Sequence, residues 1–396
     1  MTRPIRVLAV DHTAGVRPFR KKFEAIATQP GIELTVLAPE RWIENYREIR
    51  ADDEAGSGYG FRLGRVGWPG YENRAFFYRG LGRAIRDARP DILHLWEEPF
   101  SAIALQALIL ASIWAPRAAP IFFSSDNLSR GFRYSYRPSA FYAAVERYAH
   151  RRCVAGTAVS QEVVDVLRSK GFTKPVEVIP HGIDLVDYPK DSTGNWGRRA
   201  SREEVLARFG LEAPIVGFTG RLLRQKGVEL VLRAIAGMGA TRPSLVIMGD
   251  GPEREALERE ARDLGIEDRT LFLRAVPHGE MPAVLASIDV LVVPSRTTPK
   301  WKEQFGRVLI EGMAAGCITI GSTSGAIPEV LDAGGIVVEE GSVEGLISAM
   351  RLAISNEKGV ASIREKARAR VEERYTWEAI AKRIVSLYGS ITPGLK

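Results

Sequence analysis

Residues 218–228 read FTGRLLRQKGV and contain three basic residues between two glycines. The pattern predicts a strand ending at Gly220, a short loop holding Arg221 and Lys226, and an amphipathic helix opened by Gly227. Helix N-terminal N–H groups and two fixed cations suit a diphosphate, and the glycines let the backbone approach it closely. An ordinary strand-to-helix turn with surface basic residues produces the same pattern, so both interpretations stay open.

Two glutamates eight residues apart, Glu303 and Glu311, follow another predicted strand. Eight helical steps of ~100° overshoot two turns by ~80°, so both cannot lie on one face of one helix. If the helix begins near Phe305 and Gly306, Glu303 lies on the preceding loop and Glu311 faces inward. With the N–H groups of Phe305, Gly306 and Arg307, the carboxylates suit a sugar ring and a ribose diol. Solvent-exposed glutamates on an amphipathic helix are the alternative.

Four further polar residues lie at predicted strand ends in the first half of the chain: His94, Glu98, Asp126 and His181. Each is a candidate to lie near an acceptor hydroxyl. Each also has a structural alternative, since a strand-end histidine is often a satisfied polar residue and Asp126 can cap the turn it begins.

Short β-branched runs alternate with helical patterns along the whole chain, which predicts an α/β fold with parallel sheets covered by helices. In the first half the expected strands are residues 5–10, 34–38, 62–66, 91–95, 121–124, 156–159 and 176–179. In the second half they are residues 215–218, 245–248, 270–273, 290–293, 317–320 and 335–338. The chain therefore carries two sheets, and ligands are expected at the carboxyl edges of their strands.

Residues 184–200 are rich in Pro, Gly, Asp and Ser and lack a period, which predicts a boundary between domains. We expect a first Rossmann-like domain at 1–185, a linker at 186–200 and a second Rossmann-like domain at 201–376. The last helical segment, 377–396, is expected to pack back on the first domain.

Composition restricts the class of protein. The chain has 396 residues, 45% of them apolar and 26% charged, which is enough for two cores and excludes disorder. Its two cysteines, Cys153 and Cys317, cannot supply a disulfide framework or a cysteine zinc site. The N-terminus shows no export signal, and the longest apolar run, 102–115, is too short to span a bilayer. We therefore expect a cytoplasmic protein.

Positive charge suggests possible partners. The net charge is +7 and the isoelectric point about 9.4, but no nucleic-acid recognition motif accompanies them, so no nucleic-acid partner is expected. A basic cluster lies beside Phe19 and Phe23. Its members are Arg17, Arg20, Lys21 and Lys22. Such a cluster can contact an anionic membrane surface or an acidic substrate, and a solvated helix face is the alternative.

Taken together, the segments resemble the family 4 retaining glycosyltransferases with the GT-B fold. The resemblance rests on the G-R-L-x-x-x-K-G stretch at 220–227 and the E-x7-E pair Glu303 and Glu311. Further matching pieces are residues 178–184 (VIPHGID), 249–252 (GDGP), 272–276 (FLRAV), 294–295 (PS) and 325–329 (GAIPE). They follow one another in the family's order over essentially the whole chain.

This resemblance implies roles for individual residues. Arg221 and Lys226 would hold the donor diphosphate, Glu311 the ribose and Glu303 the sugar hydroxyls, while the base would lie near Arg274 to Val276 with Glu329 nearby. The expected donor-binding set is Gly220, Arg221, Lys226, Val276, Glu303, Phe305, Gly306, Arg307 and Glu311. The expected catalytic groups are Arg221, Lys226, Glu303 and His94.

Two first-half features depart from the family pattern. Where many members have a glycine pair after the first strand, this chain has only Gly15, in Asp11-His-Thr-Ala-Gly15. Where many have His-x-His, this chain has His94-Leu-Trp96, followed by Glu97 and Glu98. The expected acceptor-side set is accordingly Gly15, Glu98, Asp126 and His181.

The function implied is transfer of a sugar, with retained anomeric configuration, from a nucleotide-diphosphate sugar to a hydroxyl acceptor. A UDP-sugar is favoured over a GDP-sugar, and no other cofactor is expected. Because no Asp-x-Asp motif occurs, we expect no metal dependence. A nucleotide-sugar epimerase of related architecture and a non-enzymatic two-lobed sugar-binding protein are the alternatives.

Overall fold

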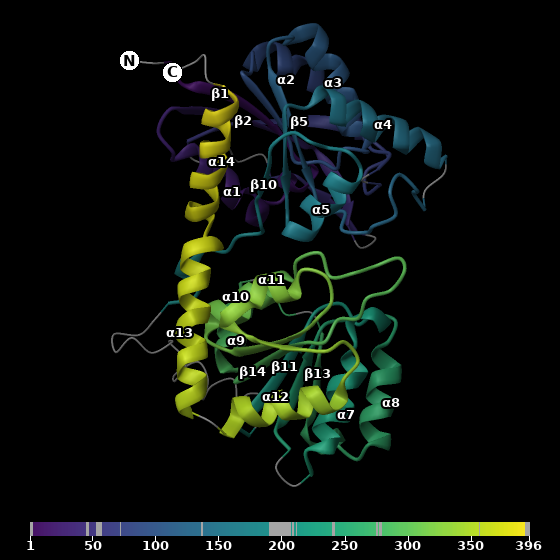
Figure 1. Ribbon diagram of the computed structural model, residues 1–396, viewed down its shortest axis with the longest axis vertical. Helices are drawn as coiled ribbons and strands as arrows, with labels where there is room; N and C mark the ends of the chain where they lie inside the picture. Colours follow the sequence, from purple (N-terminus) through teal and green to yellow (C-terminus); the bar gives the residue numbers. More distant parts are fainter. Residues whose placement is uncertain are drawn as a thin grey trace. The chain divides into compact units, whose positions relative to one another are not determined.

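The computed structural model describes residues 3–44, 47–52, 58–71, 73–135, 138–189, 207, 210, 212–239, 242–274, 276, 279–355 and 357–392. They form two compact units. Unit 1 is Met1–Gly182 with Trp377–Lys396, and unit 2 is Ile183–Thr376 (Figure 1). Of the expected linker, residues 186–189 fall in unit 2, and 190–200 lie outside the described residues. No helix formed by the described residues has the length and apolarity needed to cross a membrane.

Unit 1 is built on an eight-stranded sheet in the order β10-β9-β8-β7-β1-β2-β5-β6. Neighbouring strands are parallel, except that β6 runs antiparallel to β5 at the edge. The strands are β1 (Ile5–Val10), β2 (Ile32–Pro39), β5 (Gly60–Gly67), β6 (Phe76–Arg79), β7 (Ile92–Leu95), β8 (Ala119–Ser124), β9 (Ala155–Ala158) and β10 (Val176–Val178). A separate hairpin pairs β3 (Arg41–Glu44) with β4 (Arg47–Arg50).

In the described part of unit 1, six α-helices cover this sheet. They are α1 (Lys21–Ala27), α2 (Leu81–Ala88), α3 (Ala102–Trp114), α4 (Ser139–Arg152), α5 (Gln161–Ser169) and α14 (Trp377–Ile391). Helix α3 begins at Ser101, whose Oγ accepts the Ala104 N–H at 3.1 Å. Helix α14 packs beside α1 and buries Ile380, Ile384 and Tyr388, whose four-residue spacing gives one apolar stripe (Figure 1).

Unit 2 contains a six-stranded, wholly parallel sheet in the order β13-β12-β11-β14-β15-β16. The strands are β11 (Ile215–Thr219), β12 (Ser244–Met248), β13 (Thr270–Leu273), β14 (Val290–Val293), β15 (Ile318–Ser322) and β16 (Ile336–Val338). The helices are α7 (Val228–Gly237), α8 (Arg254–Asp263), α9 (Met281–Ser287), α10 (Arg307–Ala315), α11 (Ile327–Leu331), α12 (Val343–Ser355) and α13 (Glu357–Arg374).

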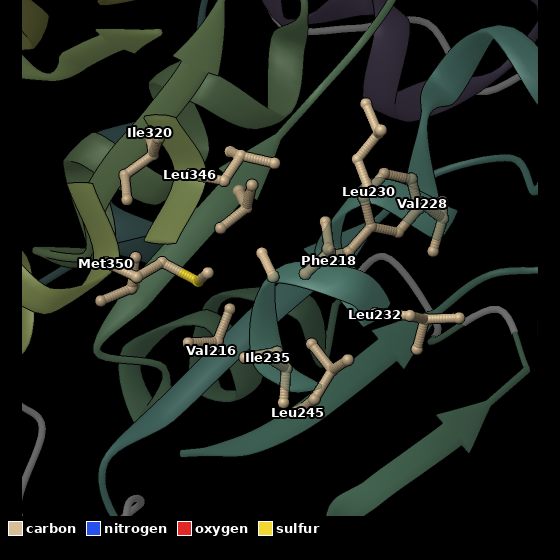
Figure 2. Packing of buried hydrophobic residues seen from close by; sticks show 14 of the residues in the cluster. Val216, Phe218, Val228, Leu230, Leu232, Ile235, Leu245, Ile320, Leu346 and Met350 are labelled. Atoms are coloured by element: carbon tan, nitrogen blue, oxygen red, sulfur yellow. The ribbon is translucent and has the colours of Figure 1, made fainter. Parts of the chain in front are cut away.

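The core of unit 2 lies between its strands and helices. Phe218 of β11, Ile235 of α7 and Met350 of α12 are at most 1% exposed and belong to one apolar cluster (Figure 2). Because β11 and β12 are covered on both faces, their residues are apolar almost without alternation, as expected for central parallel strands. This packing fixes where the strand ends, and hence the loops that follow them, must lie.

The predicted α/β class with two parallel sheets is confirmed. Every expected strand is present, and no strand end differs from its expected position by more than two residues. The hairpin β3–β4 and the edge strand β6 were not predicted. These three strands are only four residues long, and charged residues interrupt β3 and β4, so none shows the length and pattern that mark a buried strand.

The basic cluster near the N-terminus does not form the charged face that the sequence suggested. Arg20 is 1% exposed, and its guanidinium donates to the carbonyls of Ala14 and Gly15 at 2.7 and 3.1 Å. Lys22 pairs with Asp11 at 2.5 Å, and Phe23 is buried. Half of the cluster thus stabilises the loop after β1, which a count of charges cannot reveal.

Candidate functional site

Four loops meet at the carboxyl edge of the unit 2 sheet, and glycines set their spacing. A Cβ on Gly249 would lie 1.9 Å from the Gly220 carbonyl oxygen, and one on Gly325 would lie 2.0 Å from that of Glu303. A Cβ on Gly227 would lie 2.3 Å from the Pro294 oxygen. All of these glycines have positive φ, so a side chain is excluded both by space and by backbone conformation. The loops after β11, β12, β14 and β15 therefore pack backbone to backbone.

This packing brings Lys226 and Glu303 together although 77 residues separate them. The Lys226 ammonium lies 2.6 Å from Glu303 Oε2, which also accepts the Ser295 hydroxyl at 2.7 Å. Glu303 is only 7% exposed, so the pair lies in surroundings that screen charge weakly. Lys226 also lies 4.8 Å from the centre of the Trp301 ring. The two residues that were expected to hold diphosphate and sugar hydroxyls are thus direct neighbours.

Arg221 follows Gly220 on the same loop and is exposed. Its backbone carbonyl accepts the Leu223 N–H at 2.9 Å, while its guanidinium has no hydrogen-bond or ion-pair partner among the residues the structure describes. Gly220, with φ +152°, donates its N–H to the Met248 carbonyl at 3.0 Å. A fixed loop therefore carries an available guanidinium, the arrangement that an oxyanion ligand requires.

Helix α10 positions the second glutamate. It begins at Arg307, one residue later than expected, after Gly306 in the left-handed conformation. Glu311 lies 3.0 Å from the Arg307 guanidinium, one turn away. Burial raises the pKa of the Glu311 carboxyl above its ordinary value, and Arg307 opposes that shift. Phe305 is buried, its ring 5.8 Å from Tyr375, so its side chain anchors the helix start.

The region expected to hold the base is described only in part. Val276 is half-buried and Arg274 is exposed, while residues 275, 277 and 278 lie outside the described residues. Glu329 lies in the first turn of α11, where its carbonyl accepts the Arg370 guanidinium. That Val276, Arg274 and Glu329 lie near the nucleotide base of the donor stays a prediction.

In unit 1, the carboxyl ends of the neighbouring strands β7 and β8 bring Glu98 and Asp126 together. Glu98 accepts hydrogen bonds from the Ser125 N–H and hydroxyl at 2.7 and 2.8 Å and from the Ser124 hydroxyl at 2.8 Å. Burial, and secondarily the charge of Asp126, raise the pKa of Glu98 to about 7. A carboxyl group with such a pKa is able to exchange a proton near neutral pH.

Asp126 is held by a buried cation that the sequence did not single out. Lys170 lies 3.3 Å from Asp126 and 3.0 Å from Glu146, and both Lys170 and Glu146 are buried. Arg130 contacts Asp126 at 3.1 Å from the loop itself. Lys170 follows α5 and Glu146 lies on α4, so no spacing in the sequence links them to Asp126. These ion pairs hold the loop after β8 in place.

His94 lies in the core of unit 1. It is 0% exposed, its Nδ1 lies 2.8 Å from the Tyr388 hydroxyl of α14, and its ring stacks on Trp96 at 4.5 Å. Burial, and secondarily the charge of Lys22, lower the pKa of His94 to about 3, so the ring is neutral near pH 7. These contacts give His94 a structural role, and its catalytic role stays a prediction that its burial does not favour.

The remaining acceptor-side candidates lie on other loops. Gly15 is buried after β1, where its carbonyl accepts the guanidinium of Arg20. His181 is exposed after β10. Gly15 and His181 thus lie on loops other than those that carry Glu98 and Asp126.

A pH-dependent stability test follows from the raised pKa of Glu98. Because the folded carboxyl binds its proton more tightly than an ordinary glutamate, it stabilises the fold at low pH, and this contribution is lost as pH rises through about 7. Glu98→Gln keeps a carbonyl acceptor for Ser125 but cannot ionise. We expect the free energy of unfolding of the variant, relative to wild type, to rise by about 1 to 3 kcal/mol between pH ~5 and ~8 in urea titrations. Parallel pH profiles would contradict the assignment.

Among the described residues, no group of three or more His, Cys, Asp or Glu side chains is placed to hold a metal ion. Both cysteines are buried as free thiols.

Comparisons with known sequences agree with these motifs. A family model described as "Glycosyl transferases group 1" matches residues 202–370, and one described as "Glycosyltransferase Family 4" matches residues 27–187. Together they cover the motif-bearing parts of both units.

Individual relatives were found as well. The GDP-mannose-dependent alpha-(1-6)-phosphatidylinositol monomannoside mannosyltransferase of Mycolicibacterium smegmatis is 30% identical, over 73% of this chain and 80% of that protein. The 2-deoxystreptamine N-acetyl-D-glucosaminyltransferase of Streptomyces fradiae is 28% identical over 68% of this chain, and the match spans 64% of that relative's length. The 2-deoxystreptamine glucosyltransferase of Streptomyces kanamyceticus is 31% identical over half of each protein, 50% and 51%.

Solved structures share the fold. HepE of Anabaena in complex with UDP has a TM-score of 0.70 and 18% identity, covering 98% of this chain and 100% of that one. A glycosyltransferase of Rickettsia africae has a TM-score of 0.71 and 16% identity, covering 98% of both chains. At these identities the similarity establishes the two-domain GT-B architecture.

Proposed function

The chain belongs to the group 1 glycosyltransferases of the GT-B fold, and from this premise we propose that it transfers a sugar from a nucleotide-diphosphate sugar to a hydroxyl acceptor, retaining the anomeric configuration. The observation that carries the proposal is the Lys226–Glu303 pair beside the loop of Arg221. The proposal is supported because two cations suited to a diphosphate and a carboxylate suited to hydroxyl groups lie at one sheet edge.

In this proposal, the donor binds to unit 2. Arg221 and Lys226 bind the diphosphate, Glu311 accepts the ribose hydroxyls, and Glu303 accepts sugar hydroxyls while fixing the position of Lys226. As the bond between the anomeric carbon and the phosphate oxygen breaks, negative charge builds on the diphosphate. The guanidinium and the ammonium stabilise that charge more in the transition state than in the ground state, which lowers the barrier.

The proposed transfer needs no protein nucleophile. The acceptor oxygen forms the new bond on the face from which the diphosphate departs, and the acceptor proton passes to a phosphate oxygen. Glu98 and Asp126 of unit 1 are proposed to bind acceptor hydroxyls. No metal ion is assigned a role in this proposal.

For the donor we propose a UDP-sugar, with a GDP-sugar as the competing choice. The relatives include enzymes named for GDP-mannose and for N-acetylglucosamine transfer, with 2-deoxystreptamine or phosphatidylinositol derivatives in their names. The acceptor is therefore proposed only as a hydroxyl-bearing molecule.

A thermal-shift screen of UDP- and GDP-sugars tests the proposal. A ligand at 100 times its dissociation constant stabilises by about 2.7 kcal/mol, which corresponds to roughly 5 to 11 °C for a unit of this size. We expect UDP-sugars to give that shift, GDP-sugars not to give it, and the matching free nucleosides to give none. If no nucleotide sugar raised the thermal midpoint, the result would contradict the proposed donor site. Conversion of the bound donor without any acceptor would instead indicate an epimerase.

A further inference from the structure

Unit 1 exposes large apolar side chains on two adjacent helices. Ile109, Ile113 and Trp114 of α3 are 44%, 60% and 47% exposed, and Phe141 of α4 is 47% exposed. Ile109 and Ile113 are one turn apart and lie on the same face of α3. The helix carries no charged residue, and its outward surface is therefore apolar where that of a water-exposed helix is ordinarily polar.

The same layer of helices also carries exposed arginines. Helices α2 and α3 pack side by side, as do α3 and α4. The exposed cations on this layer are Arg83 and Arg86 of α2, Arg117 after α3, and Arg147, Arg151 and Arg152 of α4. The Arg86 guanidinium lies 5.4 Å from the centre of the Trp114 ring, so the basic and apolar parts touch.

Acidic residues do not balance this charge. Asp87 of α2 lies 2.8 Å from Arg62 and 3.6 Å from Arg83, and Glu146 of α4 is 1% exposed and pairs with Lys170 at 3.0 Å. These are the acidic residues of the three helices. The six exposed arginines outnumber these two carboxylates, so the α2–α4 layer presents aliphatic and indole groups beside a net positive charge.

We propose that the outer surface of α2, α3 and α4 docks on an anionic phospholipid bilayer. Ile109, Ile113, Trp114 and Phe141 enter the boundary between headgroups and acyl chains, and the arginines contact lipid phosphates. A second copy of this chain fits less well, because a twofold-symmetric contact would place arginines against the same arginines. This surface is separate from the Arg17–Lys22 segment, and the inference does not rest on the proposed sugar transfer.

Vesicle co-sedimentation tests the inference on the whole chain. Wild-type protein is expected to sediment with vesicles of phosphatidylcholine and phosphatidylglycerol and to stay in solution with phosphatidylcholine alone. The variants Ile109→Ser/Ile113→Ser and Arg151→Glu/Arg152→Glu are each expected to weaken binding at least about tenfold, the first through lost apolar burial and the second through lost attraction. The charge variant keeps the test decisive if the apolar variant fails to fold.

Unit 2 offers a matched control. Arg351 and Leu352 of α12 are also an adjacent exposed arginine and apolar residue, the latter 46% exposed. Arg351→Glu/Leu352→Ser is expected to bind anionic vesicles within twofold of wild type. Equal loss in the control and the α3 or α4 variants, or no binding by wild type, overturns the proposal. A dimer in ultracentrifugation that Ile109→Ser/Ile113→Ser converts to monomer, without vesicle binding, identifies the surface as a self-association face and also overturns it.

Discussion

Replacing Arg221 with Ala is expected to lower kcat/KM for nucleotide release from the matched donor by ~30-fold to ~1000-fold. The reason is the loss of one charge-assisted contact to the departing diphosphate, which is worth roughly 2 to 4 kcal/mol in a transition state. Because Arg221 is exposed and its guanidinium has no partner among the described residues, its removal should leave the thermal midpoint unchanged. A loss of rate can then be assigned to chemistry and not to folding.

Lys226→Ala is expected to reduce the rate over the same range, but it also leaves the buried Glu303 carboxylate without its ammonium. The stability of this variant should therefore fall as well, and Lys226→Arg should recover part of both losses. Arg233→Ala is the matched control, because Arg233 is an exposed arginine on α7 that pairs with Glu260 at 2.7 Å. Wild-type turnover in both Arg221→Ala and Lys226→Ala would reject the site.

Gly227→Ala is expected to cause a large loss of stability. Its φ of +67° costs an L-residue about 1 kcal/mol or more, and a Cβ would lie 2.3 Å from the Pro294 oxygen. Since backbone must shift to relieve that overlap, we expect a total of roughly 2 to 4 kcal/mol, or a fall of about 4 to 16 °C in the thermal midpoint. Activity of the surviving folded protein should also fall, because the shift displaces Lys226.

Gly265→Ala separates the cost of the positive φ from the cost of the overlap with backbone. It has φ +62°, and a Cβ there would have nothing within 4 Å among the described residues. Gly265→Ala should therefore lose only about 1 kcal/mol, or roughly 2 to 4 °C. Equal losses in the two variants would show that the approach of Gly227 to Pro294 does not limit stability.

The donor half of the site was accessible from the sequence for a physical reason. Its residues lie directly after strands of one parallel sheet, and the carboxyl ends of parallel strands share an edge. Lys226 and Glu303 each follow a predicted strand, which put both at that edge, and the family resemblance assigned them to one donor site. The structure adds that their strands, β11 and β14, are paired. Trp301 was not predicted, because an aromatic residue in a polar loop gives no signal of the cation that it packs against.

Unit 1 was harder to predict because its polar residues act through distant partners. His94 has the strand-end position of a catalytic group, yet it contacts Tyr388, 294 residues later, on a helix from the end of the chain. Lys170 and Glu146 anchor Asp126 from two helices, and Arg20 contacts backbone carbonyls. Each of these roles depends on the burial of a polar or charged side chain. The residue type and its spacing in the sequence do not show whether such a side chain is buried.

A crystal structure of the chain with UDP or GDP tests the central claim most directly. The proposal predicts diphosphate oxygens within hydrogen-bond distance of the Arg221 guanidinium and the Lys226 ammonium, with the ribose at Glu311. A nucleotide bound elsewhere, or bound here with both cations directed away from its phosphates, would contradict it.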